Sequence, residues 1–253
     1  MKIVIGIPAR MGSTRFPGKP LCDILGRTMI EHCYRRSSLS KIATDLFVAT
    51  CDEDIQREVK SFGGQVFMTD PNIYRPGLRV AAAAEQLEFD DDDIIVVVQG
   101  DEPLVHPGMI DLAVQPLLDN KDIFVSNLCT ELSKKEWHDP GEIKVVCDLE
   151  MNAMYMSRSP IPSIDMEEQR IVWWKQVCIM PFRWHFMKKF NHVLEPTPLE
   201  LQESIEMIRA LQHGYKVRMV PSPYLSKYVD TEDDRLEVEQ IMKTDEVYKK
   251  YST

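Results

Sequence analysis

Short apolar segments rich in β-branched residues alternate with amphipathic segments along the first hundred residues of the chain. Nearly uninterrupted apolar runs, typical of strands buried on both faces, occupy residues 2–7, 46–50, 65–69 and 94–98. Segments with helical spacing lie at residues 29–37, 55–62 and 79–87. Strands separated by helices of this length predict βαβ crossovers, and therefore an α/β fold with a doubly wound, mostly parallel sheet.

The second half of the chain has a less regular pattern. Strand-like runs without regular helices between them, which predict a smaller mixed sheet, occupy residues 123–129, 143–147, 153–157 and 176–182. The pattern then predicts one amphipathic helix over 199–213 that ends at Gly214, a last strand over 216–221 and a terminal helix over 231–242. We expect a single domain over residues 1–253, with a small mixed-sheet subdomain at residues 130–195.

Composition narrows the class of protein. The chain has 253 residues, 44% of them hydrophobic, and 40 acidic against 30 basic residues give a net charge of −10. This acidic balance argues against a nucleic-acid partner, and no apolar run approaches the roughly 20 residues that span a membrane. The first residues lack the features of a secretory signal, and six scattered cysteines lack disulfide-framework or zinc-ligand spacing. We therefore expect a cytoplasmic protein with reduced thiols.

The charge is unevenly distributed, and the loop after the first strand concentrates positive charge. Residues 1–36 carry seven basic and two acidic side chains, a local balance of 7 − 2 = +5. The loop reads PARMGSTRFPGKP from Pro8 to Pro20 and contains Arg10, Arg15 and Lys19. Its small residues allow main-chain N–H groups to approach a phosphate, and three cations with two glycines favour a triphosphate site over a plain surface turn.

A second polar segment follows the apolar run 94–98 and reads QGDEP. Ligands of a parallel sheet bind outside the carboxyl ends of its strands, so Asp101 stands at the expected edge. Mg²⁺ usually binds one or two carboxylates together with substrate phosphates, which makes Asp101 a candidate ligand, although it could simply begin a turn. The aspartate run at 90–93 is expected to be a solvated loop.

Seven segments together resemble one known family, the Kdo (3-deoxy-manno-octulosonate) cytidylyltransferases, also called CMP-Kdo synthetases. They read, in order, IPARMGSTRFPGKPL, VATCDEDI, QGDEPL, IKVV, MYMSRSPIP, PLELQESIEMIRAL and VDTEDD. The resemblance implies a nucleotide-binding fold of the nucleotide-diphospho-sugar transferase type and a homodimer. It also implies a Mg²⁺-dependent reaction of CTP with an acidic sugar, giving a CMP-sugar for lipopolysaccharide or capsule biosynthesis, with acceptor binding and dimerisation assigned to the 130–195 subdomain.

The same resemblance assigns site residues by position. The CTP contacts would be Pro8, Ala9, Arg10, Ser13, Arg15, Lys19, Arg79 and Gln99. The catalytic set would be Arg10, Lys19, Asp101 and Asp230, of which Asp101 and Asp230 would hold the metal. The sugar contacts would be Gln99, Arg158, Gln176, Met180 and Glu203. For Arg158 and Glu203, a surface ion pair is the alternative interpretation.

The chain departs from the family pattern at two places. Residues 75–79 read RPGLR where the family usually has Ser-Gly-Thr-Asp/Glu-Arg, and Gln176 and Met180 replace a histidine and a tyrosine. Because a lost hydrogen-bonding pair can change discrimination by orders of magnitude, we hypothesise an acceptor that is a variant of Kdo. Two alternatives stay open: the same fold acting on another small acid, phosphorylated or phosphonate, and a catalytically silent nucleotide-sugar sensor. The presence of both Asp101 and Asp230 argues against the sensor.

Overall fold

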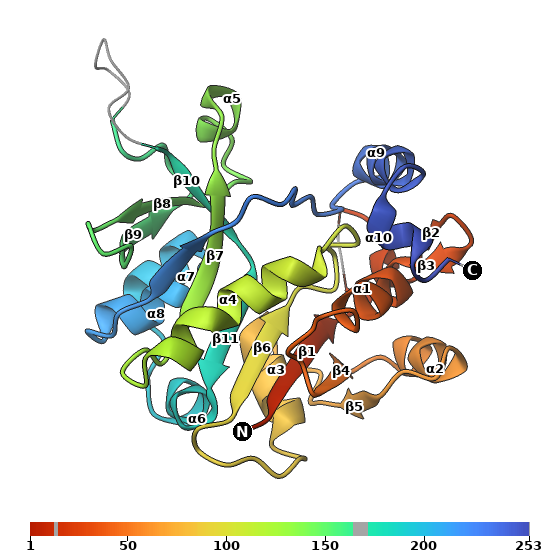
Figure 1. Ribbon diagram of the computed structural model, residues 1–253, viewed down its shortest axis with the longest axis horizontal. Coiled ribbons are helices and arrows are strands. Elements are labelled where there is room, and N and C mark those ends of the chain that lie inside the picture. Colours follow the sequence, from red (N-terminus) through yellow and green to blue (C-terminus); the bar gives the residue numbers. More distant parts are fainter. Residues whose placement is uncertain (13–14, 164–171, 253) are drawn as a thin grey trace. The chain divides into compact units, whose positions relative to one another are not determined.

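The chain forms two compact units, each with its own sheet. The computed structural model describes residues 1–12, 15–163 and 172–252. Unit 1 comprises Met1–Asp111 and Tyr224–Thr253, and unit 2 comprises Leu112–Pro223 (Figure 1). The subdomain predicted at 130–195 falls inside unit 2, which begins earlier and ends later.

A parallel sheet forms the centre of unit 1. Its strands are β1 (Ile3–Ala9), β4 (Asp45–Thr50), β5 (Val66–Met68) and β6 (Ile94–Val98), and within this unit they run in the order β6-β1-β4-β5. All three pairings are parallel. β1 and β6 are buried along their whole length, as their uninterrupted apolar sequence predicts. The α/β fold with a mostly parallel sheet is therefore confirmed.

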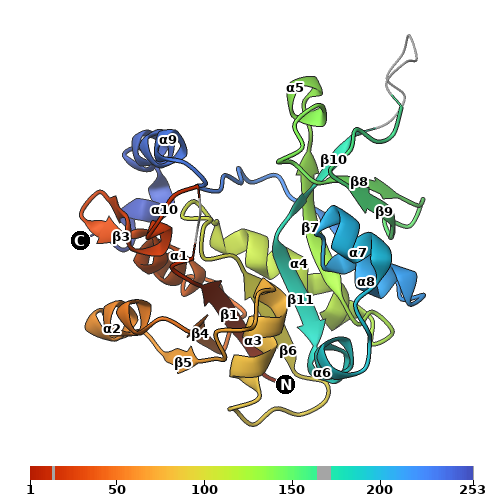
Figure 2. The same ribbon diagram turned by 180° about the vertical axis from the view of Figure 1, so that it is seen from behind.

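Helices cover both faces of this sheet. They include α1 (Met29–Ser37), α2 (Glu53–Ser61) and α3 (Pro76–Ala84), and Figures 1 and 2 show α1 and α3 on opposite faces. α1 begins at a Thr28 cap that accepts the Glu31 N–H, and α3 begins with a proline in its first turn. The other elements of unit 1 are η1 (Lys19–Leu21), β2 (Asp23–Ile24), β3 (Arg27–Thr28), α9 (Glu232–Met242) and α10 (Glu246–Lys249).

Unit 2 contains the predicted mixed sheet. Its strand order is β12 (Arg218–Pro221), β7 (Ser126–Glu131), β10 (Trp174–Val177), β8 (Lys144–Cys147) and β9 (Ala153–Ser157). The β12–β7 pairing is parallel and the other three are antiparallel. This part of the chain also contains α5 (Lys134–Trp137), β11 (Ile179–Arg183) and α6 (Trp184–His192), and α4 (Pro107–Asp119) precedes them.

Two predicted elements are divided in the structure. The single helix predicted over 199–213 is two helices, α7 (Pro198–Glu203) and α8 (Met207–Gln212), because Ser204 adopts a left-handed backbone with φ 57°. The single strand predicted over 176–182 is likewise β10 followed by β11, with a break at Cys178. In both cases the apolar spacing continues across the break, so periodicity did not reveal it. The helices α4 and α6 were not predicted, and α4 contains Pro116, which reads as a helix breaker.

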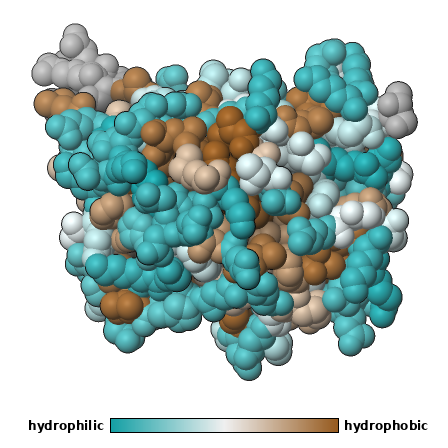
Figure 3. All heavy atoms as spheres, turned by 60° about the horizontal axis from the view of Figure 1, so that its bottom comes forward, coloured by the Kyte–Doolittle hydropathy of each residue, from teal (hydrophilic) through white to brown (hydrophobic). Residues whose placement is uncertain are grey.

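The surface mixes polar and apolar groups. Figure 3 shows one face on which hydrophilic residues surround smaller groups of hydrophobic ones. Among the described residues, no helix is long and apolar enough to cross a membrane. All six cysteines belong to the described part of the chain, and all are free thiols, as predicted.

Candidate functional site

The loop after β1 is tied to the neighbouring strand by Asp52. This residue occupies the N-cap position of α2, two positions after the end of β4, and its Oδ2 accepts the Met11 main-chain N–H at 2.9 Å. Arg10 is exposed, and its guanidinium carbon lies 5.9 Å from the centre of the Tyr74 ring. Pro8 and Ala9 form the carboxyl end of β1, while Ser13 lies outside the described residues. The loop therefore starts from a fixed point at the strand edge where ligands of parallel sheets bind.

Lys19 points back toward this edge because of the turn that carries it. Gly18 has φ 72°, a left-handed conformation that glycine adopts without strain, and it caps the short helix η1. The Lys19 N–H donates to the Phe16 carbonyl at 3.2 Å, and its own carbonyl accepts from Cys22 at 3.1 Å. The main chain at Lys19 is therefore fixed on both sides.

Two segments far apart in sequence bring Asp101 and Asp230 together. A Cβ on Gly100 would lie 2.6 Å from the Pro8 carbonyl oxygen, so glycine lets the chain leaving β6 pass close to the end of β1. The Val229 N–H donates to the Asp101 carbonyl at 2.9 Å, which places Asp230 beside Asp101.

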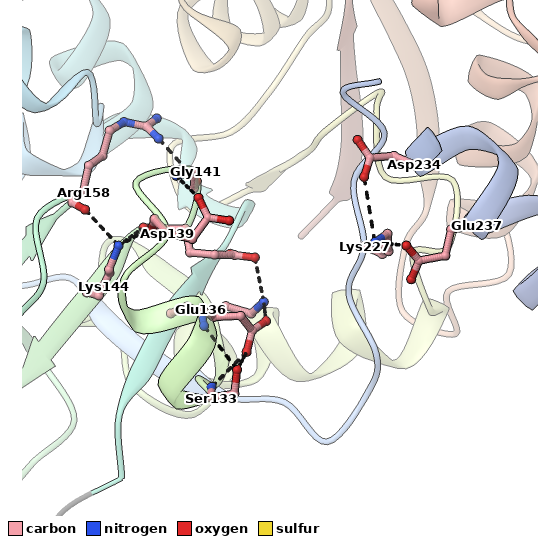
Figure 4. Close-up of polar contacts among 11 residues, drawn as sticks. Ser133, Glu136, Asp139, Gly141, Lys144, Arg158, Lys227, Asp234 and Glu237 are labelled. Atoms are coloured by element: carbon pink, nitrogen blue, oxygen red, sulfur yellow. Dashed lines mark hydrogen bonds and ion pairs between the residues drawn. The ribbon is translucent and has the colours of Figure 1, made fainter. Parts of the chain in front are cut away.

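The segment before α9 is itself anchored. Thr231 and Asp234 form a capping box, and the Asp234 carboxylate also accepts the Asp230 N–H at 3.1 Å. Lys227 donates to Glu237 at 2.6 Å and lies 3.8 Å from Asp234, which ties the preceding residues to the same helix (Figure 4). The position of Asp230 is thus set by a helix N-terminus.

Four of the predicted residues meet in one charged cluster. Lys19 Nζ lies 2.8 Å from Asp101 Oδ2 and 3.0 Å from Asp230 Oδ1, and Arg15 Nη2 lies 2.9 Å from Asp230 Oδ2. Only 11% of the Lys19 side chain is exposed. Burial lowers the pKa of Lys19, but the two carboxylates more than offset this and the pKa is raised from its ordinary value. Lys19 is therefore an ammonium at neutral pH.

The donor chemistry of this cluster fits Mg²⁺. Two carboxylate oxygens from separate segments converge on one point, now the Lys19 nitrogen, and Mg²⁺ prefers such hard oxygen ligands. Within residues 1–12, 15–163 and 172–252, no group of three or more His, Cys, Asp or Glu side chains could hold a metal. Asp101 and Asp230 would therefore need substrate oxygens and water to complete the coordination of the ion.

Arg79 and Gln99 lie in the same unit with different surroundings. Arg79 is buried, donates to Thr69 Oγ1 at 2.5 Å and also donates to the Ile73 carbonyl. Its guanidinium therefore orders the loop between β5 and α3, which leads into residues 75–79, where the chain departs from the family pattern. Gln99 is half-buried and directly follows β6, beside Gly100.

In unit 2, Glu203 and Arg158 are joined mainly through main-chain atoms. The Arg158 N–H donates to Glu203 Oε2 at 2.9 Å, and Arg158 Nε donates to the Glu203 carbonyl at 3.0 Å. Ser157 and Tyr155 donate to Glu203 Oε1 at 2.7 and 3.3 Å. Burial raises the pKa of Glu203, but these donors outweigh it and the pKa is lowered, so the side chain is an anion.

Gln176 and Met180 also lie together in unit 2. Gln176 Nε2 donates to Asn127 Oδ1 at 2.5 Å and lies 3.9 Å from the Met180 sulfur. Asn127 is buried in β7 and donates to the Val177 carbonyl at 2.6 Å, which fixes its amide. The two substituted positions therefore form one group, with Asn127 as a partner.

Sequence reasoning missed Asp52 and Asn127. Asp52 stands in the quoted segment VATCDEDI, where the position after a strand end could have identified it. Asn127 interrupts an apolar run with a buried amide, which is a weaker signal because many strands carry one polar residue.

Comparisons with known proteins identify the family that this chain resembles over most of its length. The sequence profile of a family described as Cytidylyltransferase matches residues 3–219. A 3-deoxy-manno-octulosonate cytidylyltransferase of Geobacter metallireducens is 40% identical over 247 residues, covering 92% of this chain and 95% of the relative. An 8-amino-3,8-dideoxy-manno-octulosonate cytidylyltransferase of Shewanella woodyi is also 40% identical, over 237 residues, covering 92% of this chain and 96% of the relative.

A solved structure is similar over nearly the whole length. It is a CMP:2-keto-3-deoxy-manno-octonic acid synthetase in complex with CTP, with a TM-score of 0.89 and 32% identity. The match covers 96% of this chain and 99% of the other. The architecture of both units therefore has a counterpart in a protein that binds CTP.

Proposed function

Because the chain belongs to the cytidylyltransferase family, we propose that it transfers the cytidylyl group of CTP to a Kdo-like ulosonic acid and releases pyrophosphate. The observation that carries the proposal is the cluster of Lys19, Arg15, Asp101 and Asp230 at the carboxyl edge of the parallel sheet. Enzymes of phosphoryl transfer depend mainly on such positioning and charge neutralisation.

The side chains of unit 1 have separate roles in this reaction. The anomeric hydroxyl of the acceptor forms a bond to the α-phosphorus and loses its proton, while the bond from that phosphorus to the bridging oxygen breaks. Arg10, Arg15 and Lys19 bind the triphosphate and stabilise the negative charge of the departing pyrophosphate. Asp52 keeps the loop that carries these cations attached to β4.

Asp101 and Asp230 would hold Mg²⁺. When bound there, the ion would supply positive charge at the α-phosphate and the attacking oxygen. The carboxylates would then exchange the Lys19 ammonium for the metal, which would leave Lys19 available to the phosphates.

Removal of either carboxylate tests the proposal. We expect Asp101→Asn and Asp230→Asn each to lower pyrophosphate release from CTP by at least about 100-fold, as loss of an electrostatic group at a reacting phosphate does. Asp90→Asn is the matched control, because Asp90 is an exposed aspartate of the run at 90–93. If the unaltered protein releases no pyrophosphate with any acid in a broad panel, the transferase proposal fails and the sensor alternative stands.

The identity of the acceptor is a finer proposal. Relatives named for Kdo and for 8-amino-3,8-dideoxy-manno-octulosonate are equally similar to this chain, at 40% identity. Since Gln176 and Met180 replace a histidine and a tyrosine of the Kdo pattern, we propose a modified ulosonic acid, with the 8-amino sugar as the first candidate. The panel should contain Kdo, the 8-amino sugar, and phosphorylated and phosphonate acids.

A variant at Gln176 and Met180 tests whether these two residues set the choice of acceptor. Gln176→His with Met180→Tyr restores the two polar residues, and we expect the ratio of kcat/KM for Kdo to that for the modified acid to rise at least about tenfold. Each single substitution serves as a control, since Gln176 also bonds Asn127. Efficient turnover of Kdo by the unaltered protein would refute the altered acceptor while leaving the transferase proposal intact.

Three further assignments complete the proposal. The changed segment at 75–79 calls for competition calorimetry of CTP against UTP, ATP and GTP, with CTP expected to bind most tightly. We propose a homodimer, which light scattering on the purified protein would test. We also propose a cytoplasmic location, which cell fractionation would test.

A further inference from the structure

Lys144 is a fully buried lysine whose ammonium lies among main-chain carbonyls. It is the first residue of β8, and its side chain has no solvent exposure. Its Nζ donates to the carbonyls of Asp139 at 2.5 Å, Glu142 at 2.8 Å and Arg158 at 2.8 Å (Figure 4). One side chain therefore connects the loop between α5 and β8 to the end of β9.

Arg158 binds the same loop. Its Nη1 donates to the carbonyls of Pro140 at 3.1 Å and Gly141 at 3.4 Å. Together with the Lys144 bonds, four consecutive carbonyls, from residues 139 to 142, each accept a hydrogen bond from a cationic side chain. This pattern orders the loop by direct contact with two charges.

Burial of the Lys144 ammonium carries a desolvation cost. A lysine is almost never fully buried unless its charge is compensated, and here its three hydrogen-bond acceptors are neutral main-chain carbonyls. Removal of its ammonium would leave these part-buried carbonyls without their donor, which destabilises the folded loop.

Arg158 also binds Glu203, so the ordered loop and Glu203 are connected through Arg158. The Arg158 N–H and Nε bind the carboxylate and the carbonyl of Glu203, at 2.9 and 3.0 Å. Lys144 donates to the Arg158 carbonyl and thus fixes the Arg158 main chain. That main chain carries both the Arg158 guanidinium and the N–H that binds Glu203. The family resemblance assigns Arg158 and Glu203 to the acceptor of the proposed function.

On the basis of that proposed function, we propose that Lys144 is a positioning residue for the acidic acceptor. It holds the Arg158 main chain against the carbonyls of the loop 139–142, and so sets the direction of the Arg158 guanidinium and the Glu203 carboxylate. Its own side chain, enclosed by the protein, would not touch the substrate.

Kinetics with two substrates tests this role. We expect Lys144→Met to raise KM for the acceptor at least about tenfold while KM for CTP stays within about twofold, because acceptor contacts alone are misdirected. Lys144→Gln, which keeps a donor, provides a milder second variant should the methionine protein fold poorly. In an Arg158→Ala background, Lys144→Met should raise the acceptor KM by less than about twofold, since the two residues act through one another.

Arg183→Met is the matched control in the same unit. Arg183 is also a buried cation that donates to main-chain carbonyls, those of Leu117 at 2.5 Å and Ile123 at 3.1 Å. The Arg183→Met substitution should lower the melting temperature without a selective effect on the KM for the acceptor. If Lys144→Met lowers the melting temperature like Arg183→Met but leaves the acceptor KM within twofold, Lys144 is only structural and the inference is overturned.

Amide hydrogen exchange provides a readout that needs no turnover. Lys144→Met should speed exchange at the Arg158 and Ser159 amides at least about tenfold, whereas Arg183→Met should leave them unchanged. If the unaltered protein turns over no acceptor, the proposed function fails, and exchange at Arg158 still decides whether Lys144 orders that segment. Unchanged exchange at Arg158 overturns the inference whatever the activity.

Discussion

Replacement of Lys19 by methionine removes the positive charge between Asp101 and Asp230 while keeping an unbranched side chain that is one atom shorter. The ammonium contacts both carboxylates, at 2.8 and 3.0 Å. After the substitution, the two carboxylates face each other, and within the described residues the ion-pair partner left to Asp230 is Arg15, whose side chain is 68% exposed. We therefore expect Lys19→Met to destabilise unit 1.

The size of the effect follows from the burial of the three groups. The loss of one partner from a fully buried pair costs about 3–5 kcal/mol, and an exposed pair is worth about 0–1 kcal/mol. The Lys19 side chain is 11% exposed, and those of Asp101 and Asp230 are 33% and 19% exposed, which places the cluster between these limits. We expect a loss of about 2 kcal/mol, or a decrease of about 4–8 °C in the melting temperature for a chain of this size.

The pH of the assay does not limit the test. The pKa of Lys19 is raised in the folded protein, so its stabilising contribution is fully present below the unfolded value of 10.5 and is lost only as the pH rises above it. Thermal unfolding at pH 7.5 therefore measures the whole effect.

Titration with Mg²⁺ separates the two roles of the cluster. In Lys19→Met, a divalent ion can neutralise Asp101 and Asp230 without displacing an ammonium, and a ligand at 100 times its Kd stabilises a protein by about 2.7 kcal/mol. We expect Mg²⁺ to restore the melting temperature of Lys19→Met, to stabilise the unaltered protein less, and to have no effect once Asp230→Asn is added. A variant as stable as the unaltered protein without Mg²⁺ would refute the charge argument, and one insensitive to Mg²⁺ would refute the metal site.

Three further predictions concern stability. Burial lowers the pKa of His32 in the folded protein, so the free energy of unfolding should fall as the pH drops below 6.5, by at most about 1.4 kcal/mol at pH 5.5. His32→Gln should abolish this contribution to the pH dependence of stability, as measured by urea unfolding. Burial raises the pKa of Glu136, but hydrogen bonds from Lys175 and from the Ser133 helix cap lower the pKa to about 2. The stability that this carboxylate contributes above pH 4.5 should therefore be lost as the pH falls toward 2. Lys175→Met should remove about 1 kcal/mol of that contribution after allowance for solvent screening. Arg209→Met should lower the free energy of unfolding by about 3–5 kcal/mol, because it leaves the fully buried Glu200 carboxylate without its cationic partner. The double variant with Glu200→Leu should recover most of this stability. Equal losses in the single and double variants would contradict the buried-pair argument.

The parallel sheet could be predicted because buried strands have a local signal. β6 is five apolar residues between polar loops, and its boundaries agree with the prediction. The break at Ser204 had no such signal, because the apolar spacing of the sequence continues across residues 199–211 and the left-handed residue between α7 and α8 is an ordinary serine.

The candidate site was predicted in part, for a different reason. Asp101 and Asp230 lie 129 positions apart, and only the resemblance to a family paired them; the structure brings them together through the bond from Val229 to the Asp101 carbonyl. Lys144 could not be singled out, since a lysine at the start of a strand is usually solvated. Its burial depends on carbonyls from two other segments, which no local pattern contains.

The charge of the cluster also bears on how CTP and metal would bind. Lys19 and Arg15 contribute two positive charges, and Asp101 and Asp230 contribute two negative charges, so the group is neutral as a whole. A neutral group on a protein of net charge −10 offers little attraction to a triphosphate beyond that of Arg10 and the loop amides. Neutralisation of the carboxylates by Mg²⁺ would free both cations for the phosphates and change the local balance to +2. CTP and Mg²⁺ should therefore bind cooperatively, and by reciprocity each should raise the affinity of the other by the same factor.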